Sequence, residues 1–303
     1  MTDSTRIACF FSTSGHSGVD RAAKHLIPAF ARRGYRVDLL KVRRHGPELK
    51  DAPPGVEVID LGSRHTYGCL PALVRYLRRK RPVAMLSDKD RVNRTALLAR
   101  FLARVPTRLV FRSGTTISMD LSTRGPVELW IQRNSMGKLY RFADNVIVNS
   151  WSVADDMAEF TGLPRDHINV VPNPAVPASL FEIAQPRPKH PWFVEGAAPV
   201  ILGVGELCSR KDFPTLIRAF SIVRRDRDCR LVILGKGAQR ETLLSLASEL
   251  GVRADIDLPG FKPDPHSFMA HAAVFAFTSL WEGNPFVLPE ALSVGTPVVA
   301  TDC

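Results

Sequence analysis

Residues 279–303 read SLWEGNPFVLPEALSVGTPVVATDC, and this stretch predicts a loop, a short helix and a strand in succession. The apolar run AVFAF at residues 273–277 comes just before it and is typical of a buried strand. A helix is expected over residues 285–293, with Gly295 at its end. A second buried strand is expected at residues 297–300.

Two carboxylates stand out in this stretch. Glu282 lies in the loop of Gly, Asn and Pro, and Glu290 lies within the expected helix. The first amides of a helix can bind an anion that faces them. A carboxylate on each side of such an anion could accept the hydroxyls of a sugar or a ribose. The alternative interpretation is two exposed acids near the start of a helix, with no functional role.

The alternation of strand and helix also opens the chain. A strand is expected over residues 6–12, a helix over residues 19–33 and a strand over residues 37–42, which predicts a parallel sheet covered by helices. Gly15 and Gly18 lie in the turn after the first strand, where open α/β sheets bind ligands. The spacing differs from the dinucleotide motif GxGxxG, so nicotinamide binding is not expected.

The second half of the chain begins in the same way. A strand over residues 200–204 runs into a turn that contains Gly205. Arg210 and Lys211 follow, just before a helix expected over residues 213–225. Cations beside the free amides of a helix start predict a phosphate-binding site. The alternative is a surface pair of arginine and lysine.

The domain organisation follows from length and from proline content. A chain of 303 residues is long enough for two domains, at roughly one per 150 residues. Regular patterning stops in a Pro-rich, polar stretch before the second opening strand. We therefore expect a first α/β domain at residues 1–178, a linker at residues 179–195 and a second α/β domain at residues 196–303.

The charge is unevenly distributed. The formal net charge is +11, and residues 1–178 hold 28 Lys and Arg against 16 Asp and Glu. A basic first half predicts an anionic partner, which could be a phospholipid surface, a phosphorylated acceptor or nucleic acid. Nucleic acid is not expected, because the basic half lacks interleaved aromatic residues and any known nucleic-acid module. The plainer explanation of the charge is solubility.

Several classes of protein and site are not expected from the residues. No apolar run approaches the roughly 20 residues of a membrane span, and the N-terminus does not resemble a signal peptide. The five scattered cysteines are typical of reduced thiols in a cytoplasm. Asp88 and Asp90 spell the metal-binding pattern DxD, but three residues alone do not predict a metal site. His16 could contact a substrate, although an exposed loop histidine is the simpler interpretation.

A set of motifs in fixed order resembles a known family. The chain resembles the retaining glycosyltransferases of family 4, and in particular the branch that builds bacterial polysaccharide or lipopolysaccharide. The resemblance implies the GT-B architecture of two Rossmann-like parallel-sheet domains. The motifs that carry it, in chain order, are GHSGVDRAAKHLIPAFARRGYRVDLL, DNVIVNSWSVADDM, INVVPNPAV, HPWF, GVGELCSRKDFPTLIRAF, RLVILGKGAQRETLLSLASELGV, LPGFKPDP and the stretch with the two glutamates.

The resemblance implies an enzyme. It would be a hexosyltransferase-type glycosyltransferase that moves a sugar from a UDP- or GDP-sugar to a glycan or lipid-linked acceptor, with retention of anomeric configuration. It would require no metal or other cofactor. It would work in the cytoplasm, in peripheral contact with the anionic inner face of the plasma membrane. The alternative is a protein that binds a nucleotide-sugar without turnover.

The resemblance also implies roles for individual residues. Glu290 would bind the nucleotide ribose, and Lys211 with Arg210 would hold the departing diphosphate. Gly15 and Gly18 would close over the phosphates from the first domain. The remaining donor-site residues would be Glu282, Gly283, Asn284, Pro285, Phe286 and Val287 at the sugar and diphosphate, Gly205 in the turn, and Gly260 and Phe261 along the base.

Three departures from the family pattern affect these expectations. Relatives carry arginine five positions before the lysine, whereas this chain has Glu206 there. Either Arg210 supplies the missing cation, or Glu206 points away, or activity is impaired. Many relatives also place a histidine after the strand at residues 109–112, and the run FRSGTTIS has none. Relatives continue beyond the position of Cys303, so we expect a second domain truncated at its C-terminus and an incomplete donor pocket.

Overall fold

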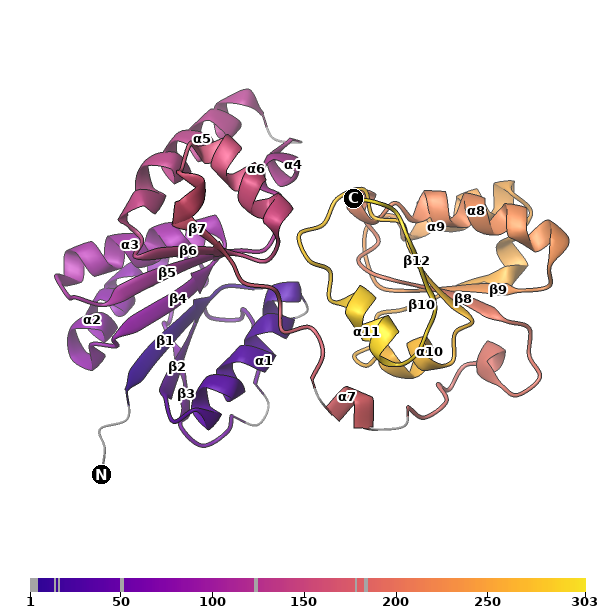
Figure 1. The fold of residues 1–303 in the computed structure, drawn as a ribbon, viewed down its shortest axis with the longest axis horizontal. Coiled ribbons are helices and arrows are strands. Elements are labelled where there is room, and N and C mark those ends of the chain that lie inside the picture. Colours follow the sequence, from indigo (N-terminus) through magenta and orange to yellow (C-terminus); the bar gives the residue numbers. More distant parts are fainter. Residues whose placement is uncertain are drawn as a thin grey trace. The chain divides into compact units, whose positions relative to one another are not determined.

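The computed structural model describes residues 5–13, 15, 17–49, 52–122, 125–177, 179–182 and 185–303. His16 therefore lies outside the described residues. The chain forms two compact units, Met1–Pro174 and Ala175–Cys303. Each unit holds one parallel sheet with helices on both faces (Figure 1). The α/β fold class predicted from the sequence is confirmed.

The sheet of the first unit has seven strands in the order β3-β2-β1-β4-β5-β6-β7. The chain starts at β1, builds outward to β3 and then crosses back to place β4 on the other side of β1. The strand order therefore reverses at β1, and ligands of open α/β sheets bind at such a reversal. The strands are β1 (Arg6–Phe11), β2 (Arg36–Lys41), β3 (Val56–Asp60), β4 (Ala84–Asp88), β5 (Arg108–Ser113), β6 (Asn145–Val148) and β7 (Ile168–Val170).

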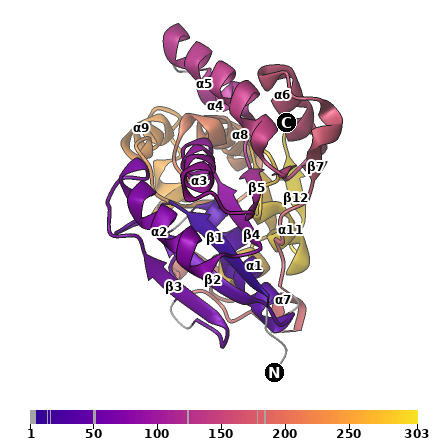
Figure 2. The same ribbon diagram turned by 90° about the vertical axis from the view of Figure 1, so that its left-hand side faces the viewer.

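Helices cover both faces of this sheet because its strands are apolar on both sides. Phe10 joins the core beneath α2 and α3, whereas its neighbour Phe11 packs with Ile27 of α1 on the opposite face. Helices α2 and α3 pack side by side (Figure 2). The helices are α1 (Gly18–Arg32), α2 (Leu70–Lys80), α3 (Asp90–Ala103), α4 (Ile117–Leu121), α5 (Pro126–Leu139) and α6 (Trp151–Thr161).

The Gly-rich turn before α1 is held by the carboxylate of Asp20. Ser17 caps the helix, and Asp20 Oδ2 accepts hydrogen bonds from the Ser17 amide at 2.7 Å and the Ser17 hydroxyl at 2.6 Å. The Thr13 hydroxyl donates to Asp20 Oδ1 from the other side of the turn. Gly15 has a φ of +91°, a conformation that favours glycine. Gly18 is the first residue of α1.

The second unit has a five-stranded sheet in the order β10-β9-β8-β11-β12. In the part of the chain that the structure describes, no helix has both the length and the apolar character needed to cross a membrane. The strands are β8 (Val200–Val204), β9 (Arg230–Leu234), β10 (Ile256–Gly260), β11 (Val274–Phe277) and β12 (Val298–Ala300). The helices are α7 (Ser179–Glu182), α8 (Phe213–Asp226), α9 (Arg240–Glu249), α10 (His266–Ala270) and α11 (Val287–Ser293).

The structure corrects two expectations about secondary structure. The strand expected to be buried at residues 297–300 is β12, which is the edge of its sheet, and Val299 is 65% exposed. An apolar run does not show whether a strand has one neighbour or two. Helix α4 was not predicted from the sequence, and its Ile117 amide donates to Asp156 Oδ2 at 2.7 Å. A contact between two helices stabilises this short segment.

The Pro-rich segment at residues 179–195 contains structure of its own. Pro191–Phe193 forms a 3₁₀ turn, and Phe193 is buried in the second core, with its ring centroid 5.2 Å from that of Phe268. His190 Nε2 lies 2.9 Å from Asp257 Oδ2 at the start of β10. The end of this segment therefore belongs to the second unit, which begins at Ala175.

Three loops at the carboxyl edge of the second sheet are tied together through their backbones. The Gly205 amide donates to Leu234 O at 2.9 Å, and the Leu207 amide donates to Lys236 O at 2.9 Å. The Gly235 amide donates to Gly260 O at 3.1 Å. The loops after β8, β9 and β10 are consequently fixed relative to one another.

Glycine is required where the first two of these loops meet. A Cβ atom on Gly237 would lie 2.2 Å from Leu207 O. We expect Gly237→Ala to lower the free energy of unfolding by about 1–3 kcal/mol, because the backbone has to move to relieve this overlap. Urea denaturation followed by circular dichroism measures the change. Gly125→Ala is the control, since its Cβ would meet nothing within 4 Å. An unchanged midpoint for Gly237→Ala would contradict the close approach.

Candidate active site

The predicted cations and the first predicted glutamate meet at the carboxyl edge of the second sheet. Lys211 lies in the turn after β8, and Glu282 lies in the loop after β11, the neighbouring parallel strand. Parallel neighbours end at the same edge of a sheet, so their loops lie together. The Leu280 amide donates to Arg210 O at 2.8 Å, and the Thr278 hydroxyl donates to Lys211 O at 3.0 Å. These bonds join the two loops.

One carboxylate oxygen is shared by both cations. Glu282 Oε1 lies 2.6 Å from Lys211 Nζ and also pairs with Arg210 Nη1. The Ser279 hydroxyl donates to the same oxygen at 3.3 Å. The Lys211 and Glu282 side chains are only 10% and 12% exposed, whereas that of Arg210 is 26% exposed. The cluster is therefore a buried lysine–glutamate pair with a more accessible arginine beside it.

Burial disfavours the charge of Lys211, and two neighbouring groups favour it. Burial lowers the pKa of Lys211, and the carboxylate of Glu282 opposes that shift. The Lys211 Nζ also lies 5.0 Å from the ring centroid of Phe277, whose face attracts a cation. Lys211, Arg210 and Glu282 together carry one positive charge, just before the N-terminus of α8. A helix N-terminus attracts anions, so the cluster and the helix favour the same sign of ligand.

Two alternatives that the sequence left open are wrong: a surface pair of arginine and lysine, and two exposed acids near the start of a helix. Lys211 is buried, with 9% of its surface exposed, so it is not part of a surface pair. Glu290 is 3% exposed, so it is not an exposed acid at the start of a helix. Glu282 was expected to face the donor, and the structure places its Oε1 against the two cations. Glu206, the residue in the position of the family arginine, is exposed.

The second glutamate has a different neighbour. Glu290 lies in the first turn of α11, and its Oε1 is 3.7 Å from Nε2 of His266 in α10. No role was predicted for His266 from the sequence. The side chain of His266 is 23% exposed, and its ring stands between Glu290 and the loop that follows β10. The structure therefore adds His266 to the candidate site.

The loop between the two glutamates contributes mainly backbone. Gly283, Asn284 and Pro285 are half-buried, whereas Phe286 and Val287 are buried where α11 begins. The side chain of Val287 packs in the core of the unit. The amides of this segment, rather than its apolar side chains, are the groups that can meet a ligand.

The other predicted glycines fall in two places. Gly205 and Gly260 lie in the tied loops at the edge of the second sheet, and Gly260 has a φ of +84°. Phe261 follows and is half-buried. Gly15 and Gly18 belong to the first unit, at the carboxyl end of β1. The contacts of the second unit therefore bring together Arg210, Lys211 and Glu282, but not the glycines of the first.

The DxD pattern pairs with arginines in the structure. Asp88 forms a buried ion pair with Arg112, and Asp90 pairs with Arg94 one helical turn later. Among the described residues there is no group of three or more His, Cys, Asp or Glu side chains that could hold a metal ion. The two aspartates thus serve the packing of the first unit.

Four site residues were not found by sequence reasoning. Phe277, Thr278 and Ser279 contact Lys211 or Glu282, and His266 faces Glu290. Ser279 and Thr278 come shortly before Glu282, so nearness to that residue was the available signal. Nothing in the sequence around His266 distinguishes it from other histidines, because its partner comes from another helix.

Comparison with known proteins identifies the family. The family model for a glycosyl transferase 4-like domain matches residues 17–174, more than half of the chain. The model for glycosyl transferases group 1 matches residues 188–303. The chain belongs to the family 4 type of glycosyltransferases. The resemblance inferred from the motifs is confirmed, and the two sheets are the GT-B fold of this family.

Relatives of this chain include glycosyltransferases of glycan biosynthesis. The N-acetylgalactosamine-N,N'-diacetylbacillosaminyl-diphospho-undecaprenol 4-alpha-N-acetylgalactosaminyltransferase from Campylobacter jejuni is 32% identical over 70% of this chain and 56% of its own length. The lipopolysaccharide core biosynthesis glycosyltransferase LpsE from Rhizobium meliloti is 31% identical over 54% of this chain and 45% of its own. The chain spans about half the length of the curated relatives that it matches.

A solved structure shows the same fold. The Anabaena protein HepE, crystallised with UDP and glucose, matches with a TM-score of 0.74 at 17% identity. The match covers 98% of this chain and 80% of the Anabaena chain. At this identity the likeness shows that the chain has the same fold as HepE, and it shows the fold alone.

The shared carboxylate leads to a prediction about stability. Glu282→Gln leaves Lys211 as a buried cation without its carboxylate, and we expect a loss of about 3 kcal/mol in the free energy of unfolding near neutral pH. Because burial already lowers the pKa of Lys211, the unfolded chain binds more protons at alkaline pH, and neutralising the lysine removes the penalty. The loss should therefore shrink as the pH approaches 10.5, the ordinary lysine value.

Denaturation at neutral and alkaline pH tests this, and Glu241→Gln is the matched control. Glu241 pairs with Arg240 at the surface and is 83% exposed, so its loss should cost less than about 1 kcal/mol at either pH. A deficit for Glu282→Gln that stays constant with pH would show that Lys211 is not its cause.

Proposed function

We propose that this chain provides the donor and acceptor machinery of a retaining glycosyltransferase, which moves a sugar from a nucleotide-sugar to a glycan or lipid-linked acceptor. The observation that carries the proposal is the buried Lys211, held with Arg210 on one oxygen of Glu282 at the start of α8. Burial of a lysine with a lowered pKa costs free energy of folding, and such residues concentrate at functional sites. Next to a helix N-terminus, the function that fits Lys211 is the binding of an anion.

The chemistry of sugar transfer requires such a cation. When the bond between sugar and diphosphate breaks, negative charge develops on the departing diphosphate. Preorganised donors in a shielded site stabilise that charge more than water does. Lys211 would hold the departing oxygens, and Arg210, the more exposed of the two, would replace the arginine that relatives carry at the position of Glu206. In a retaining reaction on one face of the sugar, the departing phosphate would take the acceptor proton.

The nucleotide would lie along the edge of the second sheet. Glu290 would accept the ribose hydroxyls, and the backbone at Gly260 and Phe261 would border the base. We propose a UDP-sugar as the first donor to test, because the Anabaena structure of the same fold was crystallised with UDP and glucose. The Campylobacter relative is named for an undecaprenol-linked substrate, which favours a lipid-linked acceptor here.

The role of Lys211 is tested by its removal. We expect Lys211→Ala to lower the rate of sugar release or transfer by roughly 10²–10³-fold, because the departing diphosphate loses a positioned cation. The measurement is UDP production from UDP-sugars with a lipid-linked or lipopolysaccharide acceptor. Arg225→Ala removes an exposed cation at the far end of α8 and is the control. Equal rates for Lys211→Ala and the unmodified chain would overturn the proposal.

We also propose that the first unit contacts an anionic membrane surface through α2 and α3. The last turn of α2 carries Arg78, Arg79 and Lys80. On α3, Leu98 and Phe101 are 44% and 77% exposed and lie three residues apart, on one side of the helix. Cations beside exposed apolar side chains suit a surface of anionic lipid headgroups.

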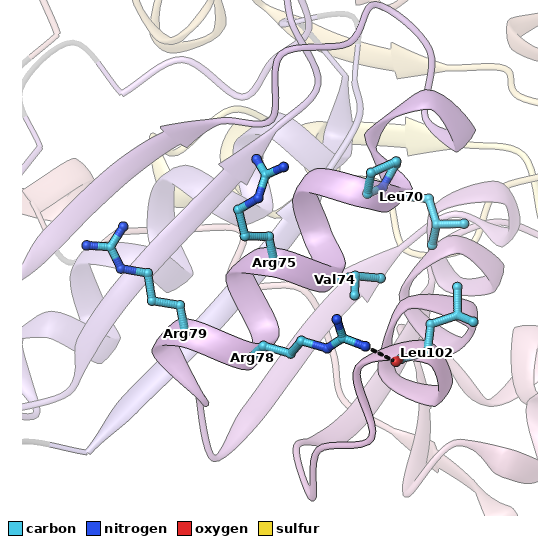
Figure 3. Close-up of a pocket in the computed structure, with 7 residues that line it drawn as sticks. Leu70, Val74, Arg75, Arg78, Arg79 and Leu102 are labelled. Carbon is cyan, nitrogen blue, oxygen red and sulfur yellow. Dashed lines mark hydrogen bonds between the residues drawn. The ribbon is translucent and has the colours of Figure 1, made fainter.

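A hollow between these helices has the same mixed character. Figure 3 shows Arg75 and Arg79 extending from α2, while Arg78 donates to Leu102 O at 2.9 Å. Four apolar residues and three arginines line the hollow. The lining residues are Leu70, Pro71, Val74, Arg75, Arg78, Arg79 and Leu102.

Vesicle binding tests the membrane contact. We expect Arg75→Gln, Arg78→Gln and Arg79→Gln together to weaken binding to phosphatidylserine vesicles by roughly a hundredfold, at about 1 kcal/mol for each cation. Co-sedimentation at low and high salt measures the binding, which should weaken with salt. Removing Arg218, Arg225 and Arg227, three exposed arginines of the second unit, is the matched control. Equal weakening by both triple variants would show that only net charge matters and would contradict a defined surface.

A further inference from the structure

Glu290 lies in a buried position beside a histidine from another helix. Its side chain is 5% exposed, and its Oε1 is 3.7 Å from His266 Nε2. That separation is within ion-pair range and beyond a hydrogen bond. The Nε2 atom is itself buried from solvent. The two side chains therefore face each other at short range, and water does not reach the Nε2 atom.

The other ring nitrogen of His266 is held by a carboxylate. His266 Nδ1 lies 2.9 Å from Asp264 Oδ1, and the same oxygen accepts a hydrogen bond from the His266 backbone amide at 3.0 Å. A carboxylate can only accept, so Nδ1 carries a proton in this arrangement. Asp264 thus fixes both the start of α10 and the orientation of the imidazole.

The two helices that carry these groups are firmly joined. Phe268 and Met269 of α10 share a core with Val287 and Ala291 of α11. The Thr296 hydroxyl, just after α11, donates to Met269 O at 2.6 Å. The positions of His266 and Glu290 relative to each other are therefore set by packed backbone elements rather than by flexible loops.

We infer that His266, oriented by Asp264, is a positioning residue that holds the Glu290 carboxylate in the place where it accepts the hydroxyls of the nucleotide ribose. This inference rests on the proposed function, in which Glu290 binds the ribose. A buried carboxylate that receives two hydroxyls has to be fixed in advance, because otherwise part of the binding energy is spent on ordering it. With Nδ1 donating to Asp264, the ring attracts a Glu290 oxygen as the imidazolium, in which Nε2 also carries a proton, and this attraction opposes rotation of Glu290.

The position of His266 in the chain supports this role. The loop that follows Gly260, the last residue of β10, borders the proposed base site and leads through Asp264 into His266. The first residues of this segment would then contact the base. Its last residue, His266, would orient Glu290, which binds the ribose. The base and the ribose of one bound nucleotide would in this way be positioned by the same segment of the chain.

The test combines changes in the protein with changes in the ligand. Calorimetry is carried out with UDP and GDP and with their 2′,3′-dideoxy counterparts. We expect His266→Leu to weaken binding of the ribonucleotide by about tenfold, because Glu290 loses the charged partner that orients it. The dideoxynucleotide should bind both proteins equally, because it has no hydroxyls for Glu290 to accept. His266→Gln, which keeps an N–H donor near the same place, should restore part of the affinity.

The controls separate this role from a structural one. His271→Leu changes a half-buried histidine at the end of α10, whose Nδ1 lies 2.9 Å from Ser267 O, and it should leave both affinities unchanged. Equal weakening of both nucleotide forms by His266→Leu, or no weakening of either, would overturn the positioning role alone. If the unmodified chain binds neither UDP nor GDP, the proposed function fails and the positioning role fails with it.

Discussion

A lysine ammonium group that leaves water needs a counter-ion, and this requirement organises the second unit. Lys211 finds its counter-ion in Glu282, which comes from the loop after β11. The pair forms only if β8 and β11 are neighbours and end at the same edge of the sheet, as they do. The hydrogen bonds from Leu280 and Thr278 to the turn at residues 210–211 then follow from that adjacency.

The same edge gathers the rest of the candidate site. Parallel strands release all their loops on one side, and the glycines at 205, 235 and 237 let the loops after β8 and β9 approach within hydrogen-bonding distance. Glu290 lies one helix further on, against His266 of α10. The acidic, basic and backbone groups of the candidate site are thus supplied by short segments widely separated in the sequence.

Much of this architecture is predictable because it depends on local patterns. Apolar runs followed by glycine turns and amphipathic helices predicted the parallel sheets, and Lys211 was recognised because it directly precedes a helix. Other features depend on neighbours that a linear pattern does not show. The exposure of Val299 follows from the edge position of β12, and the short α4 is stabilised by Asp156 of α6. The burial of Phe193 depends on Phe268.

The sequence by itself determined the α/β class, the glycosyltransferase family and the residues that carry charge at the second helix start, since these depend on composition, spacing and motif order. Only the tertiary structure decided which charges meet. It placed Glu282 on both Lys211 and Arg210 and left Glu206 exposed. It also set His266 opposite Glu290. The physical reason is that electrostatic pairing depends on distance and burial, and both are properties of packed elements rather than of chain order.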